Sequence, residues 1–295
     1  MNFIGEIAAL GAALSWAMAG LLTEKTSRKM DSTELNLVVK VLGYFMIAVV
    51  AAAAGGNVIP RGVPATAWFW LTLSGIVGFA LGDIFLFRAY HLLGTTVALL
   101  IFSVNPVITA VLGFFIFGET LTLFNIIGMA LVLVGIALVI IEGTGGRFSF
   151  RFTSAGLAAA FLAALGQSLA NLLSKQGMAG GVDVFTTTQV RLLAAIPVIW
   201  LIVRSSKRPG TLGALRNRTI LGETTLNTFL GTVVGVSLSM TAIVHTKIAI
   251  ASTLMSVSPI IVIPITVLFL KRRLDLRELL GALICVTGIA VLFIR

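Results

Sequence analysis

The stretch LIFSVNPVITAVLGFF, residues 100–115, is almost wholly apolar, yet Asn105 and Pro106 interrupt it in the middle. A second apolar stretch, TLMSVSPIIVIPITVLFL at residues 253–270, repeats Ser-Val-x-Pro 153 residues later, with Pro259 at the position of Pro106. Proline removes a backbone donor and frees the carbonyl one turn earlier. The stretches therefore predict matched helix breaks in two apolar helices. These breaks are either hinges beside a cavity or structural kinks packed between helices.

The composition predicts a membrane protein. Of the 295 residues, 58% are hydrophobic and 11% are charged, against about 25% charged in a soluble domain, and the mean hydropathy is +1.08. The formal net charge of +10 would suggest nucleic acid as the partner of a soluble protein. Here the basic residues fall in short loops between apolar runs, so we expect membrane lipid headgroups, and no nucleic acid, as their partners.

The apolar runs predict an all-α integral membrane fold with ten transmembrane helices. A spanning helix needs about 20 apolar residues. Ten runs meet this requirement: 5–23, 34–54, 66–91, 95–117, 121–141, 153–174, 183–203, 219–246, 247–270 and 275–294. The single Cys285 excludes an intrachain disulfide. No cluster of Cys and His suggests a metal and no P-loop is present, so we predict no cofactor and no use of ATP.

The chain is a duplication, with one repeat at 1–145 and the other at 146–295. A shift of 153 residues superposes the third to fifth runs on the eighth to tenth without a gap, and it aligns glycines and a proline: Gly78 with Gly231, Gly82 with Gly235, Pro106 with Pro259, Gly128 with Gly281, and Gly135 with Gly288. Each repeat holds five helices, and an odd number inverts the second repeat relative to the first. Inverted repeats are typical of secondary transporters, which bind substrate near the midplane between the repeats.

Three of the ionisable residues inside the predicted helices are candidates for a functional site. Ionisable groups at membrane depth are costly and usually face a cavity or a partner. Asp83 either binds a cation or a coupling proton, or it pairs with a neighbouring helix. Lys40 and Arg191 occupy similar positions in the second helix of each repeat, where they could extend to the interface or attract an anionic substrate group.

Neutral polar residues and one tryptophan complete the candidate site. Such residues most often form hydrogen bonds between helices. Trp16 aligns with Gln167 at a shift of 151 and could contact a cationic or aromatic substrate or pack in the bundle. The predicted substrate-binding residues are Trp16, Lys40, Asp83, Asn105, Gln167, Asn171, Gln189, Arg191 and Ser258, with Pro106 and Pro259 as hinges.

The distribution of basic residues predicts the orientation. Of 21 Lys and Arg residues, three lie within helices and fourteen lie in loops on one side. The other four, Arg61, Lys175, Lys247 and Arg295, lie on the side of both termini. The positive-inside rule then places both termini of this multi-pass cell (inner) membrane protein outside the cytoplasm.

Several motifs resemble the drug/metabolite transporter superfamily of the EamA type. They are AALSWA at 12–17, GDIFLFRAYHLLGTTVALL at 82–100, the proline and FFIFGETLT within 106–122, and LLGALICVTGIAVLF at 279–293. The resemblance implies a ten-helix carrier of small metabolites with its termini inside. Arg191 matches the family's arginine in the second helix of a repeat, where the first repeat has Lys40. Glu119 matches its acidic residue after the fourth helix, whereas the second repeat has Arg272.

Three classes of function are open to such a chain, and these observations favour a secondary carrier. The first is an exporter of a small organic solute such as an amino acid or drug-like metabolite, with protons as a candidate coupling ion. The second is a lipid translocase. An intramembrane enzyme would need converging acid and base groups, whereas His91 and His245 fall near helix ends. Because both repeats lie in one chain, the expected state is a monomer.

Overall fold

The protein is a helical bundle. The computed structural model describes residues 3–27, 29–93, 101–142, 153–206, 210–258, 260–261 and 276–292, and every regular element among them is helical. In chain order these are α1 (Ile4–Ser27), α2 (Ser32–Ala53), α3 (Ala65–Ser74), η1 (Gly75–Gly82), α4 (Asp83–Leu93), α6 (Asn105–Phe117), α7 (Leu123–Glu142), α8 (Ser154–Met178), α9 (Val184–Ser205), η2 (Leu212–Arg216), α10 (Arg218–Thr228), η3 (Phe229–Val236), α11 (Ser237–His245), α12 (Ile248–Met255) and α14 (Leu276–Leu292).

Six described helical segments are long and apolar enough to cross a membrane. They are Ile4–Ser27, Ser32–Ala53, Ala65–Leu86, Ser154–Met178, Val184–Ser205 and Arg218–His245. Each coincides with a predicted run. The predicted runs 95–117, 121–141, 247–270 and 275–294 overlap the shorter described helices α6, α7, α12 and α14. The total of ten spans therefore remains a prediction.

Aspartate caps fix where the second helix of each repeat begins. The Asp31 carboxylate accepts hydrogen bonds from the backbone N–H groups of Thr33 and Glu34 at the start of α2. Asp183 accepts in the same way from Phe185 and Thr186 at the start of α9. A side-chain oxygen at this position satisfies backbone donors that have no partner within the helix. The caps set the depth of Lys40 and Arg191, which follow on the same helices.

The third helix of each repeat contains a π-helical stretch at the glycine-rich segments. In the first repeat η1 lies between α3 and α4, and in the second η3 lies between α10 and α11. A Cβ on Gly78 would lie 2.6 Å from the Cβ of Ala170, and one on Gly235 would lie 2.5 Å from the indole nitrogen of Trp16. Glycine therefore allows these helices to approach closely, as the small residues predict.

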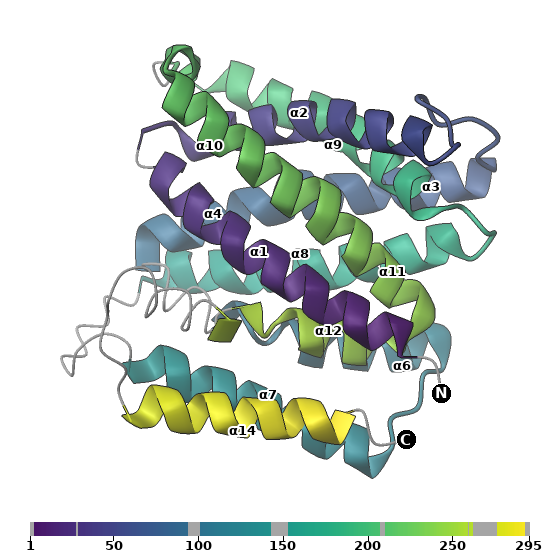
Figure 1. The fold of residues 1–295 in the computed structure, drawn as a ribbon, viewed down its shortest axis with the longest axis vertical. Coiled ribbons are helices and arrows are strands. Elements are labelled where there is room, and N and C mark those ends of the chain that lie inside the picture. The colour runs from purple at the N-terminus through teal and green to yellow at the C-terminus, as the bar shows by residue number, and fades with distance from the viewer. Residues whose placement is uncertain are drawn as a thin grey trace.

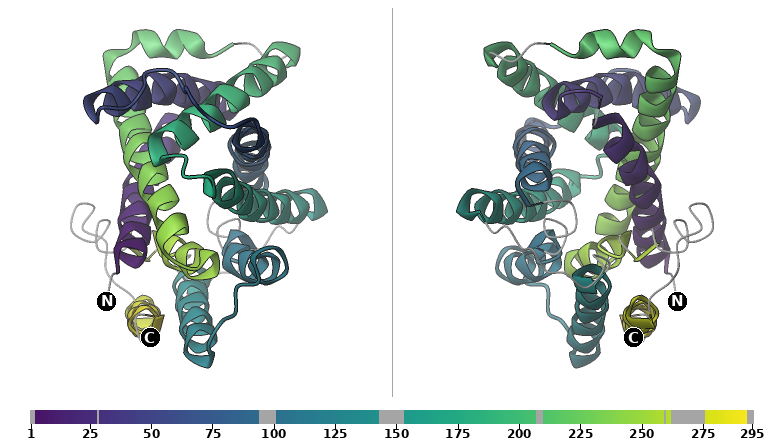
Figure 2. Two further views of the ribbon diagram at one scale, coloured as in Figure 1. Left: turned by 90° about the vertical axis from the view of Figure 1, so that its right-hand side faces the viewer. Right: turned by 90° about the vertical axis from the view of Figure 1, so that its left-hand side faces the viewer.

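The packing pairs helices from different halves of the chain (Figures 1 and 2). The α3–η1–α4 segment packs on α8, and the α10–η3–α11 segment packs on α1. In addition, α2 packs on α9, α6 on α12, and α7 on α14. The start of α1 and the end of α14 lie at the same side of the bundle (Figure 1).

Glycines form the contact between α7 and α14, which lie side by side in Figure 1. A Cβ on Gly135 would lie 2.6 Å from the carbonyl oxygen of Gly281. One on Gly288 would lie 2.8 Å from the carbonyl oxygen of Gly128. Both distances are too short for a side chain, so this helix pair depends on backbone packing between small residues.

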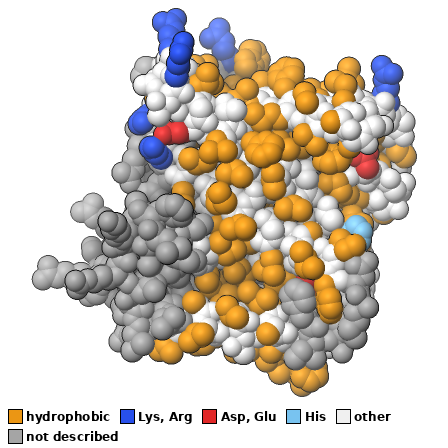
Figure 3. Space-filling model, in the orientation of Figure 1, with side chains coloured by type: hydrophobic (Ala, Val, Ile, Leu, Met, Phe, Trp, Pro, Cys, Tyr) orange, Lys and Arg blue, Asp and Glu red, His pale blue; other side chains and the backbone are white. Residues whose placement is uncertain are grey.

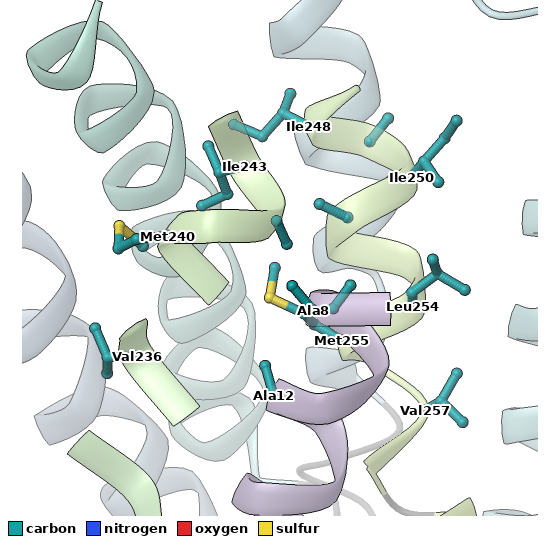
Figure 4. Packing of buried hydrophobic residues seen from close by; sticks show 14 of the residues in the cluster. Ala8, Ala12, Val236, Met240, Ile243, Ile248, Ile250, Leu254, Met255 and Val257 are labelled. Carbon is teal, nitrogen blue, oxygen red and sulfur yellow. The ribbon is translucent and has the colours of Figure 1, made fainter. Parts of the chain in front are cut away.

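The largest buried hydrophobic cluster of the described residues runs through most of the bundle, and α1, η3, α11 and α12 contribute one part of it. Figure 4 shows Ala8 and Ala12 of α1 beside Met255 of α12, with Met240 on α11. Val257 is buried just beyond the end of α12. Small alanines on α1 let the bulkier side chains of the second repeat fill the space between the helices.

A helix break precedes Pro106, as the sequence predicts. A turn at residues 103–104 separates a short helical stretch from α6, which begins at Asn105 and has Pro106 in its first turn. Proline fits that position because its missing N–H would have no helical partner there. Pro106 is buried, and a similar turn follows α12 at residues 256–257. Pro259 lies outside the described residues, and a hinge function for either proline remains a prediction.

Candidate functional site

A partly buried ion pair joins the second and third helices of the first repeat. The Lys40 ammonium donates to the Asp83 carboxylate at 2.9 Å. The Lys40 side chain is 10% exposed and that of Asp83 is 24% exposed. Asp83 therefore pairs with a neighbouring helix, one of the two roles expected from the sequence, and the pair can be reached from its Asp83 end.

The ring of Phe79 lies against both cations of this region. The Lys40 ammonium is 4.6 Å from the ring centroid, and the Arg191 guanidinium carbon is 4.1 Å from it. Asn36 donates to the Phe79 carbonyl at 3.2 Å and holds η1 on α2. Cations are attracted to the faces of aromatic rings. The structure thus brings Lys40, Asp83 and Arg191 together around Phe79, and we call these four residues the charge cluster.

Arg191 is the least satisfied member of the charge cluster. It is 1% exposed. Its Nη1 donates to the Met240 sulfur at 3.4 Å, a weak acceptor, whereas Nε and Nη2 have no hydrogen-bond partner among the described residues. An unpaired buried donor costs about 1–3 kcal/mol, and more when charged. The charge cluster holds two cations and one carboxylate, so its formal charge is positive.

Polar side chains of α8, together with Asn105 at the start of α6, form a second group next to η1, called here the α8 group. Asn105 donates to the Ala164 carbonyl at 3.2 Å, and Ser168 donates to the Asn105 carbonyl at 3.1 Å. Gln167 donates to Asn171 at 3.2 Å. The two bonds of Asn105 tie the helix break before Pro106 to α8, whereas the Gln167–Asn171 bond lies within α8. Since Gly78 of η1 faces both α8 and the Arg191 guanidinium, the α8 group lies beside the charge cluster.

The three remaining predicted residues have partners elsewhere. The Trp16 indole donates to the Gly231 carbonyl at 3.0 Å, which joins α1 to η3. Gln189 donates to two carbonyls of the loop after α2, at 3.1 and 3.0 Å. Ser258 donates to the Met255 carbonyl at 3.0 Å. Trp16 and Gln189 therefore connect separate elements, while Ser258 caps the end of α12.

A hollow of about 530 Å³ opens on the side where α1 begins and α14 ends. Its lining includes Glu6, Glu119, Lys175, His245 and Lys247. Glu119 forms an ion pair with Lys175 of α8 and accepts from the backbone N–H that starts α12. Glu119, which follows α6, thus connects that helix to α8 and α12 beside the hollow.

Phe79 is the functional candidate that sequence reasoning missed. It appears as one more apolar residue in GIVGFALG. Its spacing of four residues from Asp83 was the available signal, because residues four apart share a helix face. Met240 carries no comparable signal, since it reaches Arg191 only through the packing of α11 on α9.

The apolar helices and the buried charges define a multi-pass membrane protein. The family model of the EamA-like transporter family matches residues 3–141 and 154–294. The chain belongs to this family, which indicates a membrane transporter of the drug/metabolite type. No curated protein sequence matches the chain.

A solved crystal structure shares the fold. It superposes with a TM-score of 0.78 at 19% sequence identity, and the match covers 99% of this chain and 97% of the other. At that identity the likeness shows the fold alone.

Proposed function

We propose that the protein is a secondary-active or facilitative transporter of a small organic metabolite, such as an amino acid or drug-like compound. It would work by alternating access between two inverted five-helix repeats, 1–145 and 146–295, with the charge cluster as part of the substrate site. Export is the direction we propose, on the family resemblance. Transporters with inverted repeats bind substrate where the repeats meet, and the charge cluster combines residues of both.

The reciprocal glycine contacts carry the proposal of inverted repeats. At the 153-residue shift Gly128 corresponds to Gly281, and Gly135 corresponds to Gly288. In the structure Gly128 contacts Gly288, and Gly135 contacts Gly281. Such exchange of equivalent partners is typical of two units related by a twofold axis. The pairing of α1 with the third helix of the second repeat, and of α8 with that of the first, supports the same relation.

Transport by purified protein in proteoliposomes tests the proposed function. Labelled amino acids and organic anions and cations are offered with and without a pH gradient, and empty liposomes provide the background. We expect saturable uptake of at least one solute, with counterflow when that solute is preloaded. A protein that moves labelled phospholipid between leaflets but no solute would instead be a lipid translocase.

Asp83 is the residue we propose for proton coupling. Protonation of its carboxylate would break the pair with Lys40 and free the ammonium, so proton binding would change the charge of the substrate site. We expect Asp83→Asn to abolish the stimulation of flux by a pH gradient and to retain exchange between labelled and unlabelled solute. Unchanged gradient-driven flux in this variant removes Asp83 from the coupling mechanism.

We also propose that both termini lie outside the cytoplasm. Figure 3 shows most of the visible Lys and Arg side chains at the upper left, at the end of the bundle where α1 ends and α10 begins. Among the described residues, the exposed cations of that end include Lys25, Lys29, Arg204, Arg216 and Arg218. The positive-inside rule assigns this end to the cytoplasm. A C-terminal alkaline phosphatase fusion should be active, whereas a fluorescent C-terminal fusion that folds only in the cytoplasm contradicts the orientation.

A further inference from the structure

The free donors of Arg191 lie on one edge of its guanidinium group. Nε–H and one N–H of Nη2 point in the same direction, and these are the two nitrogens without hydrogen-bond partners among the described residues. Nη1, which lies on the other side, contacts the Met240 sulfur. Two parallel N–H donors match the two oxygens of a carboxylate. The free edge therefore has the geometry of a carboxylate receptor.

The acidic member of the charge cluster is already engaged. Asp83 forms its hydrogen bond with Lys40 at 2.9 Å, so it does not occupy the free edge of Arg191. With Lys40 and Arg191 positive and Asp83 negative, the charge cluster lacks one negative charge. A single carboxylate from outside the chain would supply that charge and satisfy both free donors.

The free edge is buried, since neither Nε nor Nη2 is exposed to solvent in this conformation, so a carboxylate reaches it only when the surrounding helices move apart. A Cβ on Gly78 would lie 3.5 Å from Nη2, so η1 packs close to this nitrogen and places no side chain on it from Gly78. The Phe79 ring lies 4.1 Å from the guanidinium carbon, measured to the ring centroid. The ring supplies an apolar surface beside the guanidinium, against which the organic part of a solute could pack.

We infer that Arg191 binds the carboxylate of the transported solute through Nε and Nη2, so that the solute is an organic monocarboxylate, either anionic or zwitterionic. This inference rests on the proposed transport function, because it takes the carboxylate to belong to a solute that binds and leaves, and not to a permanently bound ligand. It narrows the substrate class by excluding organic cations that lack a carboxylate.

Thermal unfolding of the purified protein in detergent tests this binding without a transport assay. Acetate is the probe, because it carries the carboxylate and is small enough to enter any site built for a larger one. We compare acetate with chloride at equal ionic strength, with acetamide as the neutral control and inorganic phosphate as the tetrahedral anion. A ligand that binds only the folded state raises the melting temperature. We expect acetate alone to raise it, by about 2 °C near saturation.

Two variants assign the effect to Arg191. Arg191→Met should abolish the acetate shift, and Arg191→Lys should reduce it because an ammonium lacks the two-donor edge. Lys175→Met removes a cation from the hollow that Glu119 and Lys175 line. This variant should keep the shift in melting temperature with acetate. Without acetate, Arg191→Met should melt at or above the temperature of the unaltered protein, since it replaces an unpaired buried charge with an apolar chain. A markedly lower melting temperature would mean that Arg191 is structural.

The remaining outcomes are equally decisive. An equal shift with phosphate and acetate, or an acetate shift that survives in Arg191→Met, overturns the assignment. If acetate binds at Arg191 but proteoliposomes transport no solute, the proposed function fails and the carboxylate site stands. If solutes are transported and acetate has no effect, this inference alone fails.

Discussion

The contact between η1 and α9 at Gly75 provides the sharpest test of how the charge cluster is held. A Cβ on Gly75 would lie 2.2 Å from the carbonyl oxygen of Arg191 and 2.8 Å from its Cα. Gly75 itself has helical dihedral angles, φ −63° and ψ −44°. Alanine therefore suits the backbone conformation, and Gly75→Ala changes only the packing against α9.

The size of the effect follows from two opposing terms. Relief of the overlap requires η1 and α9 to separate by roughly 1 Å, because non-bonded atoms prefer about 3.5 Å or more. Overpacking of this kind costs about 1–3 kcal/mol, and here the upper half applies because backbone atoms cannot rotate away. Alanine in place of glycine returns up to about 1 kcal/mol of helix propensity. The net destabilisation is about 1–2 kcal/mol, which lowers the melting temperature by about 2–6 °C.

Thermal unfolding in detergent measures this change, with Gly222→Ala as the matched control. Gly222 also lies in a helix, and a Cβ there would meet nothing within 4 Å. The control should therefore melt at the same temperature or higher. Because the separation of η1 from α9 moves Phe79 away from Arg191, Gly75→Ala should also weaken solute transport. A melting temperature for Gly75→Ala equal to that of the control would refute the close packing of η1 on α9.

Three further substitutions test individual contacts by the same measurement. Trp16→Phe removes the indole donor to Gly231 and should cost about 1 kcal/mol; transport that survives identifies Trp16 as structural, whereas lost affinity for solute identifies it as a binding residue. Gln189→Leu removes two hydrogen bonds to the loop after α2, and a destabilisation of about 1–2 kcal/mol is expected; no change would show that the loop is held by other contacts. Glu119→Gln leaves Lys175 without its ion partner and should lower stability by about 1 kcal/mol, less so at high salt; a salt-independent effect would argue against an ionic contact.

The sequence predicts the helical segments and their breaks well, because those features depend on local chemistry. Apolar runs of sufficient length specify the long helices, and Pro106 marks the start of α6. The caps at Asp31 and Asp183 emerge only in the structure. The repeated glycines likewise predict close helix contacts, since a missing side chain is visible in the sequence itself.

The site could be predicted only in part. Lys40, Asp83 and Arg191 stand out because charges are rare in apolar runs. Their partners do not stand out, since Phe79 and Met240 resemble ordinary core residues. Gln189 was a candidate as a neutral polar residue within a helix, and Trp16 as an aromatic residue aligned with Gln167, yet their donors meet backbone carbonyls of other elements.

The sequence by itself determined that the chain is an all-helical membrane protein with two similar halves, because solvent preference and helix length are properties of consecutive residues. Tertiary structure alone decided that Asp83 pairs with Lys40 and leaves one edge of Arg191 free. Residues 40, 83 and 191 lie on three different helices, and their distances depend on how glycine contacts set the helix packing. Charge pairing therefore follows from geometry that no local pattern in the sequence encodes.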